Sequence, residues 1–292
     1  MKLYEELCYN EKKDGDIMQK RILTIQDISC LGQCSLTVAL PIISACGVET
    51  CVLPSAVLST HTGGFTGFTF RDLTEDMPLI EKHWKRERIK YDCIYTGYLG
   101  SEKQIEYVKN IFSSCLRKSG VKVVDPAFAD NGKLYVGFDK NYVEAMKDLC
   151  SVSDILIPNL TEACFLTGTP YREKYREAYI DGILKKLSEF GVGTIILTGI
   201  GYEEGKTGVV VMRNGKKSYY EHVKLENSCH GTGDIYSSAF VGALMNEKAP
   251  FESAKIAADF TVRCIENTQK DPKHWYGARF ESVLPELIEK MK

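Results

Sequence analysis

Short apolar segments bounded by turn residues alternate with longer amphipathic segments from Arg21 to the end of the chain. This alternation is typical of parallel strands joined by crossover helices. Strands are expected at 22–25, 49–53, 93–96, 121–124, 155–157 and 194–197, with a hairpin of 208–212 and 218–223 across Asn214-Gly215. Helices are expected near 35–46, 76–89, 102–118, 140–150, 173–190, 235–246, 252–268 and 279–291. The pattern predicts an α/β fold with a mostly parallel central sheet flanked by helices.

The chain divides into a short polar extension, 1–20, and one domain, 21–292, because no linker interrupts the strand and helix pattern. The extension could be loosely held, or Leu3, Tyr4 and Leu7 could pack it onto the domain as a short helix. No internal repeat or low-complexity tract is present.

Polar residues follow five of the predicted strands. Ligands of open α/β sheets bind beyond the carboxyl ends of the strands, so these residues are candidates for a shared cleft. Polar strand ends also occur simply because loops are polar. The five strand ends are Gln26-Asp27, Thr96-Gly97-Tyr98, Asp125-Pro126, Pro158-Asn159 and Thr198-Gly199.

The tetrapeptide Gly231-Thr232-Gly233-Asp234 stands at the predicted start of a late helix. Backbone N–H groups in a first helical turn have no intrahelical partners and lie at the positive end of the helix dipole. Two glycines let a phosphate approach this backbone closely. Asp234 could then accept the proton of an alcohol that attacks phosphorus. The alternative is that Asp234 only caps the helix and the glycines only form the turn.

Composition narrows the class of partner. The 292 residues carry a formal net charge of −2, which gives no reason to expect a nucleic-acid surface, so a small molecule is the better expectation. The 11 cysteines form no C-x-x-C pair or zinc spacing, and no secretory leader is evident, so a cytoplasmic protein with reduced thiols is expected. No apolar run approaches the roughly 20 residues that span a membrane.

The motifs together resemble the ribokinase-like superfamily and, in the N-terminal half, its pyridoxal/pyridoxamine kinase branch. The resemblance covers the chain from Arg21 onward, with the motifs in the family's order and spacing. Besides Gly231–Asp234, it rests on Ile25-Gln26, Ser59–Gly63, Thr96–Tyr98, Val124–Pro126 and Pro158–Glu162. It implies a ribokinase-like three-layer fold and ATP-dependent, Mg²⁺-requiring phosphorylation of the 5′-hydroxymethyl group of a B6 vitamer. A homodimer and a monovalent cation, K⁺ or Na⁺, are further expectations from the family.

The resemblance also implies a role for each matched residue. Asp234 would be the general base, and the amides of Gly231, Thr232 and Gly233 would hold the transferring phosphate. The nucleotide and its metal would lie against Asp125, Asn159, Glu162, Thr198 and Gly199, with Asp125 and Glu162 on the Mg²⁺ side. Thr62 and Tyr98 would line the vitamer pocket.

Each of these positions has a structural alternative. Asn159 and Glu162 could cap a helix, Thr62 could be a turn residue, and Tyr98 could be a core aromatic. Asp125 before Pro126 is a common turn opening.

Three further features need a separate interpretation: one departure from the family pattern, one unusual residue pair and one possible lid. Asp27 replaces a common serine, and we hypothesise that it binds the protonated ring nitrogen of the vitamer, although it could instead bond local backbone. Cys229 and His230 precede the phosphate turn, where packing or support close to the phosphate is a simpler interpretation than a nucleophile. The segment 130–135 resembles a short lid over the phosphates, in which Lys133 could reach the triphosphate or remain a solvated lysine.

Other functions remain open at this point. A hydroxymethylpyrimidine kinase of thiamine synthesis acts on a similar flat heteroaromatic alcohol, but the Ser59–Gly63 segment favours B6. A sugar or nucleoside kinase lacks support because the paired-glycine sugar pattern is not evident. A non-catalytic B6-binding protein would have no need for Asp234, Asn159 and Glu162.

Overall fold

A computed structural model describes residues 19–225, 229–271 and 273–292. Of the expected extension 1–20, only Gln19 and Lys20 fall inside this range. Gln19 donates a hydrogen bond to the Gly47 carbonyl, and Lys20 forms an ion pair with Glu247 at 3.1 Å. The rest of that prediction lies outside the described residues.

A nine-stranded sheet, ordered β11-β10-β9-β8-β5-β4-β1-β2-β3, runs through the described part of the molecule. Its strands are β1 (Arg21–Ser29), β2 (Glu49–Leu58), β3 (Phe70–Asp72), β4 (Tyr91–Thr96), β5 (Leu116–Val124), β8 (Ile155–Leu156), β9 (Thr194–Thr198), β10 (Lys206–Arg213) and β11 (Lys216–Val223). The neighbouring pairs among β2, β1, β4, β5, β8 and β9 are parallel, whereas β3, β10 and β11 pair antiparallel. A separate small hairpin joins β6 (Ala129–Asp130) to β7 (Lys133–Leu134).

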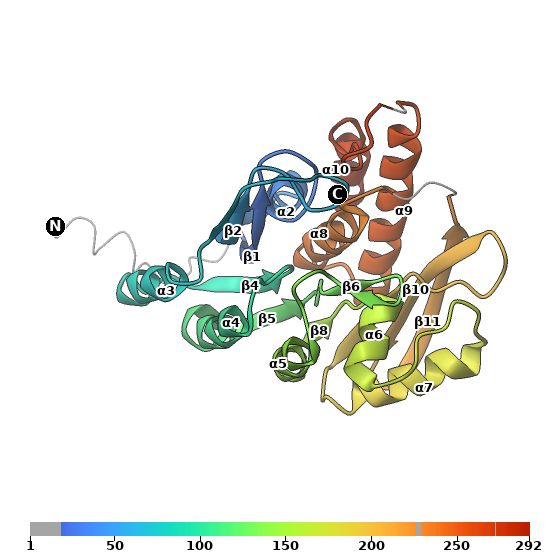
Figure 1. Cartoon of the computed structure of the whole chain (residues 1–292), viewed down its shortest axis with the longest axis horizontal. Helices are drawn as coiled ribbons and strands as arrows, with labels where there is room; N and C mark the ends of the chain where they lie inside the picture. Colours follow the sequence, from blue (N-terminus) through green and yellow to red (C-terminus); the bar gives the residue numbers. More distant parts are fainter. Residues whose placement is uncertain (1–18, 226–228, 272) are drawn as a thin grey trace.

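Helices cover both faces of the sheet, giving three layers (Figure 1). One face carries α2 (Leu36–Ala45), α8 (Thr232–Met245), α9 (Pro250–Thr268) and α10 (Leu284–Met291), with a 3-10 helix (Glu281–Val283) before α10. The other carries α3 (Met77–Arg86), α4 (Glu102–Cys115), α5 (Lys140–Ser151), α6 (Leu160–Thr167) and α7 (Glu177–Ser188). Each face has its own buried hydrophobic cluster, which explains why the central strands read as continuous apolar runs.

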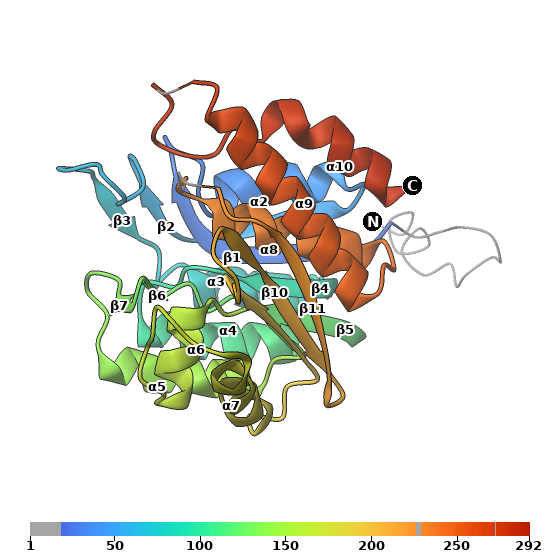
Figure 2. The same ribbon diagram turned by 90° about the vertical axis from the view of Figure 1, so that its right-hand side faces the viewer.

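The strand order reverses beside β1, since β2 lies on one side of it and β4, β5, β8 and β9 follow on the other. Such a switch point leaves an opening between the loops that follow the two adjacent strands. The loops after β1 and β4 therefore border this opening, while the β10–β11 hairpin extends the far end of the sheet (Figure 2).

The predicted α/β fold and all eight predicted strands are confirmed, as is the Asn214-Gly215 turn, where both residues have positive φ. Some boundaries were wrong. The helix expected at 102–118 ends at Cys115 because Leu116 pairs with Tyr91 as a strand, and the helix expected at 173–190 begins only at Glu177. The helix expected at 279–291 is split into the 3-10 helix and α10.

Candidate functional site

The predicted phosphate-binding turn lies at the start of α8, as the sequence pattern indicated. Gly231 is the N-cap with φ of 77°, and the first intrahelical bond runs from the Ile235 N–H to its carbonyl at 2.9 Å. A Cβ on Gly231 would lie 1.8 Å from the Gln33 carbonyl oxygen, so no other residue fits there. The N–H groups of Thr232, Gly233 and Asp234 precede this first bond and are available to an anion.

Three carboxylates converge on this turn. Burial, followed by the negative charges of Asp125 and Asp27, raises the pKa of Asp234 to about 7, against a hydrogen bond from the Ser35 backbone that lowers it. Asp234 is therefore close enough to sense both other carboxylates. A carboxyl with a pKa near neutrality is well matched to accepting and releasing a proton.

Asp125, directly after β5, lies between α8 and α6. Its carboxylate accepts a hydrogen bond from the Ser237 hydroxyl at 2.6 Å. Burial raises the pKa of Asp125 to about 7, while the Ser237 hydrogen bond and the Ala127 backbone lower it. Sequence reasoning missed Ser237, which stands one helical turn after Asp234. The Asp-x-x-Ser spacing on one helix face was the available signal.

Asn159 and Glu162 form a reciprocal capping box at the start of α6, a helix that is not among the expected helices and was raised only as the structural alternative for these two residues. The Asn159 side chain accepts the Glu162 N–H at 2.9 Å, and Glu162 Oε2 accepts the Asn159 N–H at 2.9 Å. Glu162 Oε1 also accepts the Phe128 N–H at 3.0 Å, and the Asn159 amide donates to the Ala129 carbonyl at 2.8 Å. Asn159 and Glu162 thus do cap a helix, as their structural alternative expected. The same two side chains also hydrogen-bond the loop after β5.

Glu162 is only 1% exposed. Burial, followed by the charge of Asp125, raises its pKa well above the ordinary value, against the hydrogen bonds that Glu162 accepts from backbone N–H groups. The Glu162 and Asp125 carboxylates are therefore close enough to repel each other when both are ionised. A divalent cation beside them would relieve that repulsion.

Thr198, at the end of β9, belongs to the same edge of the site as Asn159. The two residues form a bridge in which the Thr198 N–H donates to the Pro158 carbonyl at 3.0 Å. Gly199 follows with φ of 73° and open space around its Cβ position. Tyrosine hydroxyls fix the next residues, since Tyr175 accepts the Gly201 N–H at 3.2 Å and Tyr219 donates to the Ile200 carbonyl at 3.1 Å.

Asp27 and Tyr98 stand at the carboxyl ends of the adjacent parallel strands β1 and β4. Asp27 is 6% exposed at an irregularity in the β1–β2 pairing and accepts the Ser29 hydroxyl at 3.1 Å. Burial raises the pKa of Asp27 against hydrogen bonds from Ser35 and Ser29. Burial and then the charge of Asp27 raise the pKa of Tyr98 to about 12. Thr62 is exposed on the loop after β2, next to the buried His61.

The two residues before the phosphate turn have different surroundings. Cys229 packs against the hydrophobic cluster beneath α9, and burial raises the pKa of its thiol. His230 is exposed, with its ring centroid 4.9 Å from that of His61. Partial desolvation of the ring and then the charge of His61 lower the pKa of His230. This arrangement favours the packing interpretation of Cys229.

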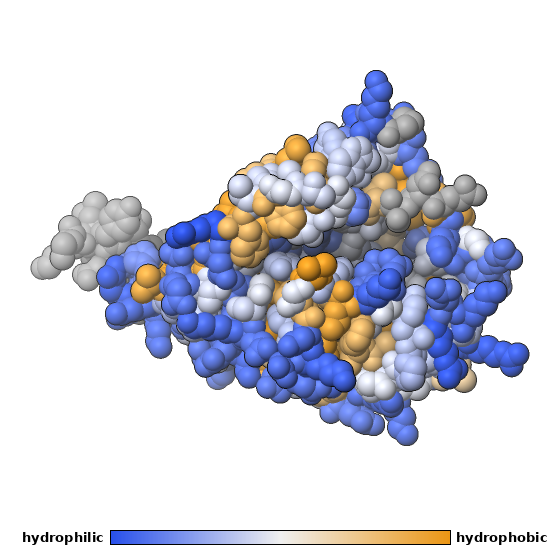
Figure 3. Space-filling model, viewed as in Figure 1, coloured by the Kyte–Doolittle hydropathy of each residue, from blue (hydrophilic) through white to orange (hydrophobic). Residues whose placement is uncertain are grey.

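The expected lid is the β6–β7 hairpin, with Asn131 and Gly132 at positive φ in its turn. The Thr161 hydroxyl of α6 accepts the Gly132 N–H at 3.0 Å, and Lys133 is exposed. The hairpin therefore stands over the helix that carries Glu162. Figure 3 shows this face of the molecule hollowed near its centre, with hydrophobic residues on both sides of the hollow.

Within the described residues, no three His, Cys, Asp or Glu side chains form a ready-made metal cluster. The carboxylates of Asp125 and Glu162 have the chemistry that Mg²⁺ favours, since it commonly takes one or two carboxylates together with substrate phosphates. Over the same residues, no helix is both long and apolar enough to cross a membrane.

The family model described as phosphomethylpyrimidine kinase matches residues 40–278. A Schizosaccharomyces pombe protein provisionally described as a pyridoxal kinase is 30% identical over 262 residues, which covers 85% of this chain and 81% of the relative.

Two solved structures have closely similar folds. One, a Bacteroides thetaiotaomicron protein provisionally described as a phosphomethylpyrimidine kinase, was crystallised with pyridoxal. It is 35% identical with a TM-score of 0.87, covering 92% of this chain and 96% of that one. The other is a pyridoxal kinase from Lactobacillus plantarum, 28% identical with a TM-score of 0.85, covering 92% and 97%.

Proposed function

Because the chain belongs to the phosphomethylpyrimidine kinase family, in the pyridoxal kinase branch of the ribokinase-like superfamily, it is a kinase, and we propose that its acceptor is a B6 vitamer. The reaction would transfer the γ-phosphoryl group of ATP to the 5′-hydroxymethyl group of pyridoxal, pyridoxine or pyridoxamine. The observation that carries this proposal is the place of Asp234 in the first turn of α8, where burial and the charges of Asp125 and Asp27 raise its pKa to about 7.

Asp234 acts as the general base. Its carboxylate accepts the proton of the hydroxymethyl group as the oxygen attacks phosphorus. The backbone N–H groups of Gly231, Thr232 and Gly233, together with that of Asp234, stabilise the charge on the transferring phosphoryl group. Gly231 makes this possible because its missing side chain lets the turn lie directly against Gln33.

Asp125 and Glu162 form the metal side. Mg²⁺ bound there would neutralise phosphate charge and relieve the repulsion between the two carboxylates. Ser237 holds the Asp125 carboxylate in place, and the capping box holds Glu162. Asn159, Thr198 and Gly199 border the nucleotide. A monovalent cation, K⁺ or Na⁺, could bind in this acidic site in addition to Mg²⁺.

Asp27, Thr62 and Tyr98 form the acceptor side. A buried carboxylate next to a phenol can accept a charge-assisted hydrogen bond from a protonated pyridine nitrogen. We therefore propose that Asp27 favours the pyridinium form of the vitamer. The protein would act in the cytoplasm as a homodimer, without a nucleic-acid or membrane partner.

A hydroxymethylpyrimidine kinase is the second candidate, favoured by the family model and by the description of the Bacteroides relative. A coupled assay of ADP release with each alcohol at matched concentrations separates the two functions. We expect turnover with pyridoxal, confirmed by formation of its 5′-phosphate, to exceed that with hydroxymethylpyrimidine. A preference for the pyrimidine alcohol would overturn the B6 assignment, and turnover of neither would leave a binding protein as the better function.

A further inference from the structure

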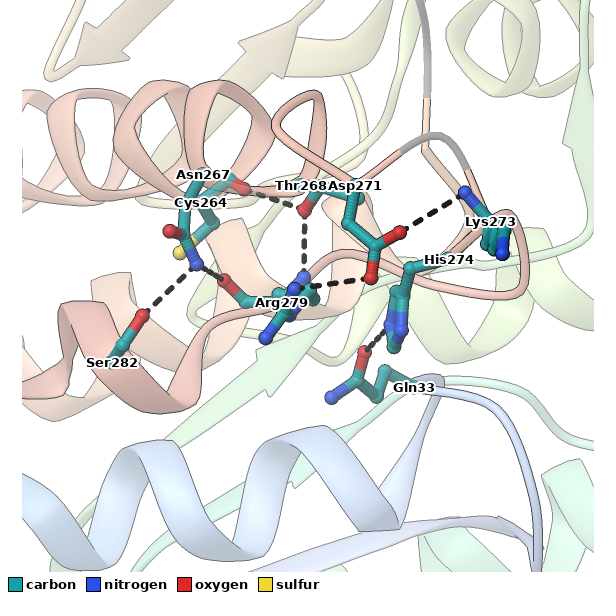
Figure 4. A network of polar contacts seen from close by, with 9 residues as sticks. All are labelled: Gln33, Cys264, Asn267, Thr268, Asp271, Lys273, His274, Arg279 and Ser282. Atoms are coloured by element: carbon teal, nitrogen blue, oxygen red, sulfur yellow. Dashed lines mark hydrogen bonds and ion pairs between the residues drawn. The ribbon is translucent and has the colours of Figure 1, made fainter.

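The loop between α9 and the 3-10 helix contacts the site from outside. We call its residues Lys273–Ala278 the strap. Hydrogen bonds fix its base, as Figure 4 shows: Thr268 Oγ1 accepts the Arg279 N–H at 2.7 Å and donates to the Cys264 carbonyl at 2.7 Å. The Asn267 side-chain amide donates a hydrogen bond to the Arg279 carbonyl at 3.0 Å, and the Arg279 guanidinium donates one to the Asp271 carboxylate at 3.4 Å.

The strap touches three segments of the site that are far apart in the sequence. Gly277 forms a parallel bridge with Gln33, on the loop after β1. His274 hydrogen-bonds the Gln33 side chain at 3.1 Å (Figure 4). The Ala278 N–H donates to the carbonyl of His230 at 3.2 Å, directly before the phosphate turn. The third segment, on the loop after β2, is reached through His61.

The His61 ring connects the strap to the loop that carries Thr62. Its Nδ1 accepts the Gly63 N–H at 3.0 Å, so Nε2 carries the hydrogen and donates to the Tyr276 carbonyl at 2.8 Å. The ring is 5% exposed and fills the space beside Gly32, where an added Cβ would lie 2.1 Å away. Both nitrogens thus have backbone partners, which fixes the orientation of the ring between the strap and the loop after β2.

Trp275 adds an aromatic contact to the same loop. Its ring centroid lies 4.6 Å from that of Phe65, and a Cβ on Gly64 would lie 2.9 Å from the indole. Trp275 is nevertheless 50% exposed, so it packs on the loop after β2 without forming part of the buried core.

We propose that the strap is a positioning element for the acceptor: through His61, Gln33 and His230 it sets the loop 61–65 relative to the turn 231–234. This inference rests on the proposed function. The contacts described above join the strap to the loops after β1 and β2 and to His230, whereas Asn159 and Thr198 are held by α6 and β9. A displaced strap therefore affects the acceptor more than the nucleotide.

The test compares Gly277→Ala with Gly182→Ala in the full-length protein. A Cβ on Gly277 would lie 2.8 Å from the Gln33 backbone nitrogen and would push the strap away, whereas Gly182, exposed in α7, has no atom within 4 Å of that position. We expect Gly277→Ala to raise KM for pyridoxal about tenfold and to change KM for ATP less than about twofold. Gly182→Ala is expected to keep wild-type kinetics.

Trp275→Ala provides a second variant that leaves the buried core intact. It is expected to raise KM for pyridoxal in the same direction, with a circular dichroism spectrum like that of the wild type. Unchanged KM for pyridoxal in both variants, or a matching rise in both KM values, would overturn the positioning role.

Hydrogen exchange of the apo protein separates this inference from the proposed function. Faster exchange of peptides covering 59–70 in Gly277→Ala and Trp275→Ala, but not in Gly182→Ala, supports the strap whatever the acceptor is. Exchange equal to that of the wild type would contradict it. Absence of pyridoxal turnover by the wild type would instead count against the B6 assignment alone.

Discussion

Asp234 has a position that its neighbours in the sequence do not explain. The helix start and the two glycines were readable as a pattern, but the value of the carboxylate as a base depends on Asp125 and Asp27, which come from β5 and β1. Their negative charges, added to burial, bring the pKa of Asp234 to about 7. The same residue would titrate far lower on an isolated helix.

The pH dependence of the reaction follows from this pKa. Only the ionised carboxylate accepts a proton, so kcat/KM should rise with pH up to about 7 and level off above it. Asp125 also has a pKa near 7, and its protonation weakens a Mg²⁺ site. We therefore expect a steeper acid limb at limiting Mg²⁺ than at saturating Mg²⁺. A profile that stays flat from pH 5 to 8 would contradict both assignments.

Asp27→Ser tests the acceptor side. Loss of a charge-assisted hydrogen bond costs about 1.5–3 kcal/mol, so we expect affinity for the B6 vitamers to fall roughly tenfold or more, measured by calorimetry. Asp148→Asn, which removes a carboxylate from an exposed position on α5, is the matched control. Unchanged affinity for every vitamer would mean that Asp27 serves only its own loop.

Long elements were predictable from the sequence and short ones were not. The strands of the parallel core and helices such as α5 and α9 have enough residues for their periodicity to be recognised. The eight residues of α6 make about two turns, and most of them are buried, so no polar face marks the helix. The Asn159-x-x-Glu162 spacing was the one sequence signal for the start of α6.

The site could be predicted only in part for a related reason. Gly231–Asp234 and the strand ends were found because each carries a local signal. Ser237 acquires its role from Asp125, 112 positions away, and His61 from the Tyr276 carbonyl, 215 positions away. Pairings of this kind are products of the fold, and no local pattern reports them.

The capping box of α6 gives a prediction at the scale of one element. Glu162→Ala removes the acceptor of two backbone N–H groups, those of Asn159 and Phe128. Each buried N–H left without a partner costs about 1–3 kcal/mol, so thermal unfolding should show a melting temperature lower by several degrees.

Glu102→Ala is the control for this change, because Glu102 also stands in a first helical turn, that of α4, but is exposed. It should shift the melting temperature only slightly. Glu162→Gln, which keeps one acceptor oxygen, should fall between the two. Equal shifts for Glu162→Ala and Glu102→Ala would show that the capping box contributes little.

Across the whole molecule, the strand order explains why the chemistry collects where it does. The reversal beside β1 brings the loops after β1, β4 and β5 together at one edge of the sheet, and α8 directs its first turn at the same place. The metal side, the base and the acceptor side thus come from elements spread over the described chain. Their arrangement follows from the sheet, while the strap ties the acceptor loops from outside.

The decisive measurement is turnover by Asp234→Asn, compared with the wild type at saturating ATP, Mg²⁺ and pyridoxal. Asparagine keeps the size of the side chain and loses the ability to accept the proton. We expect kcat to fall by about two to four orders of magnitude, while the dissociation constants for pyridoxal and an ATP analogue stay within about threefold. Retention of a tenth or more of the wild-type kcat would show that Asp234 is not the base.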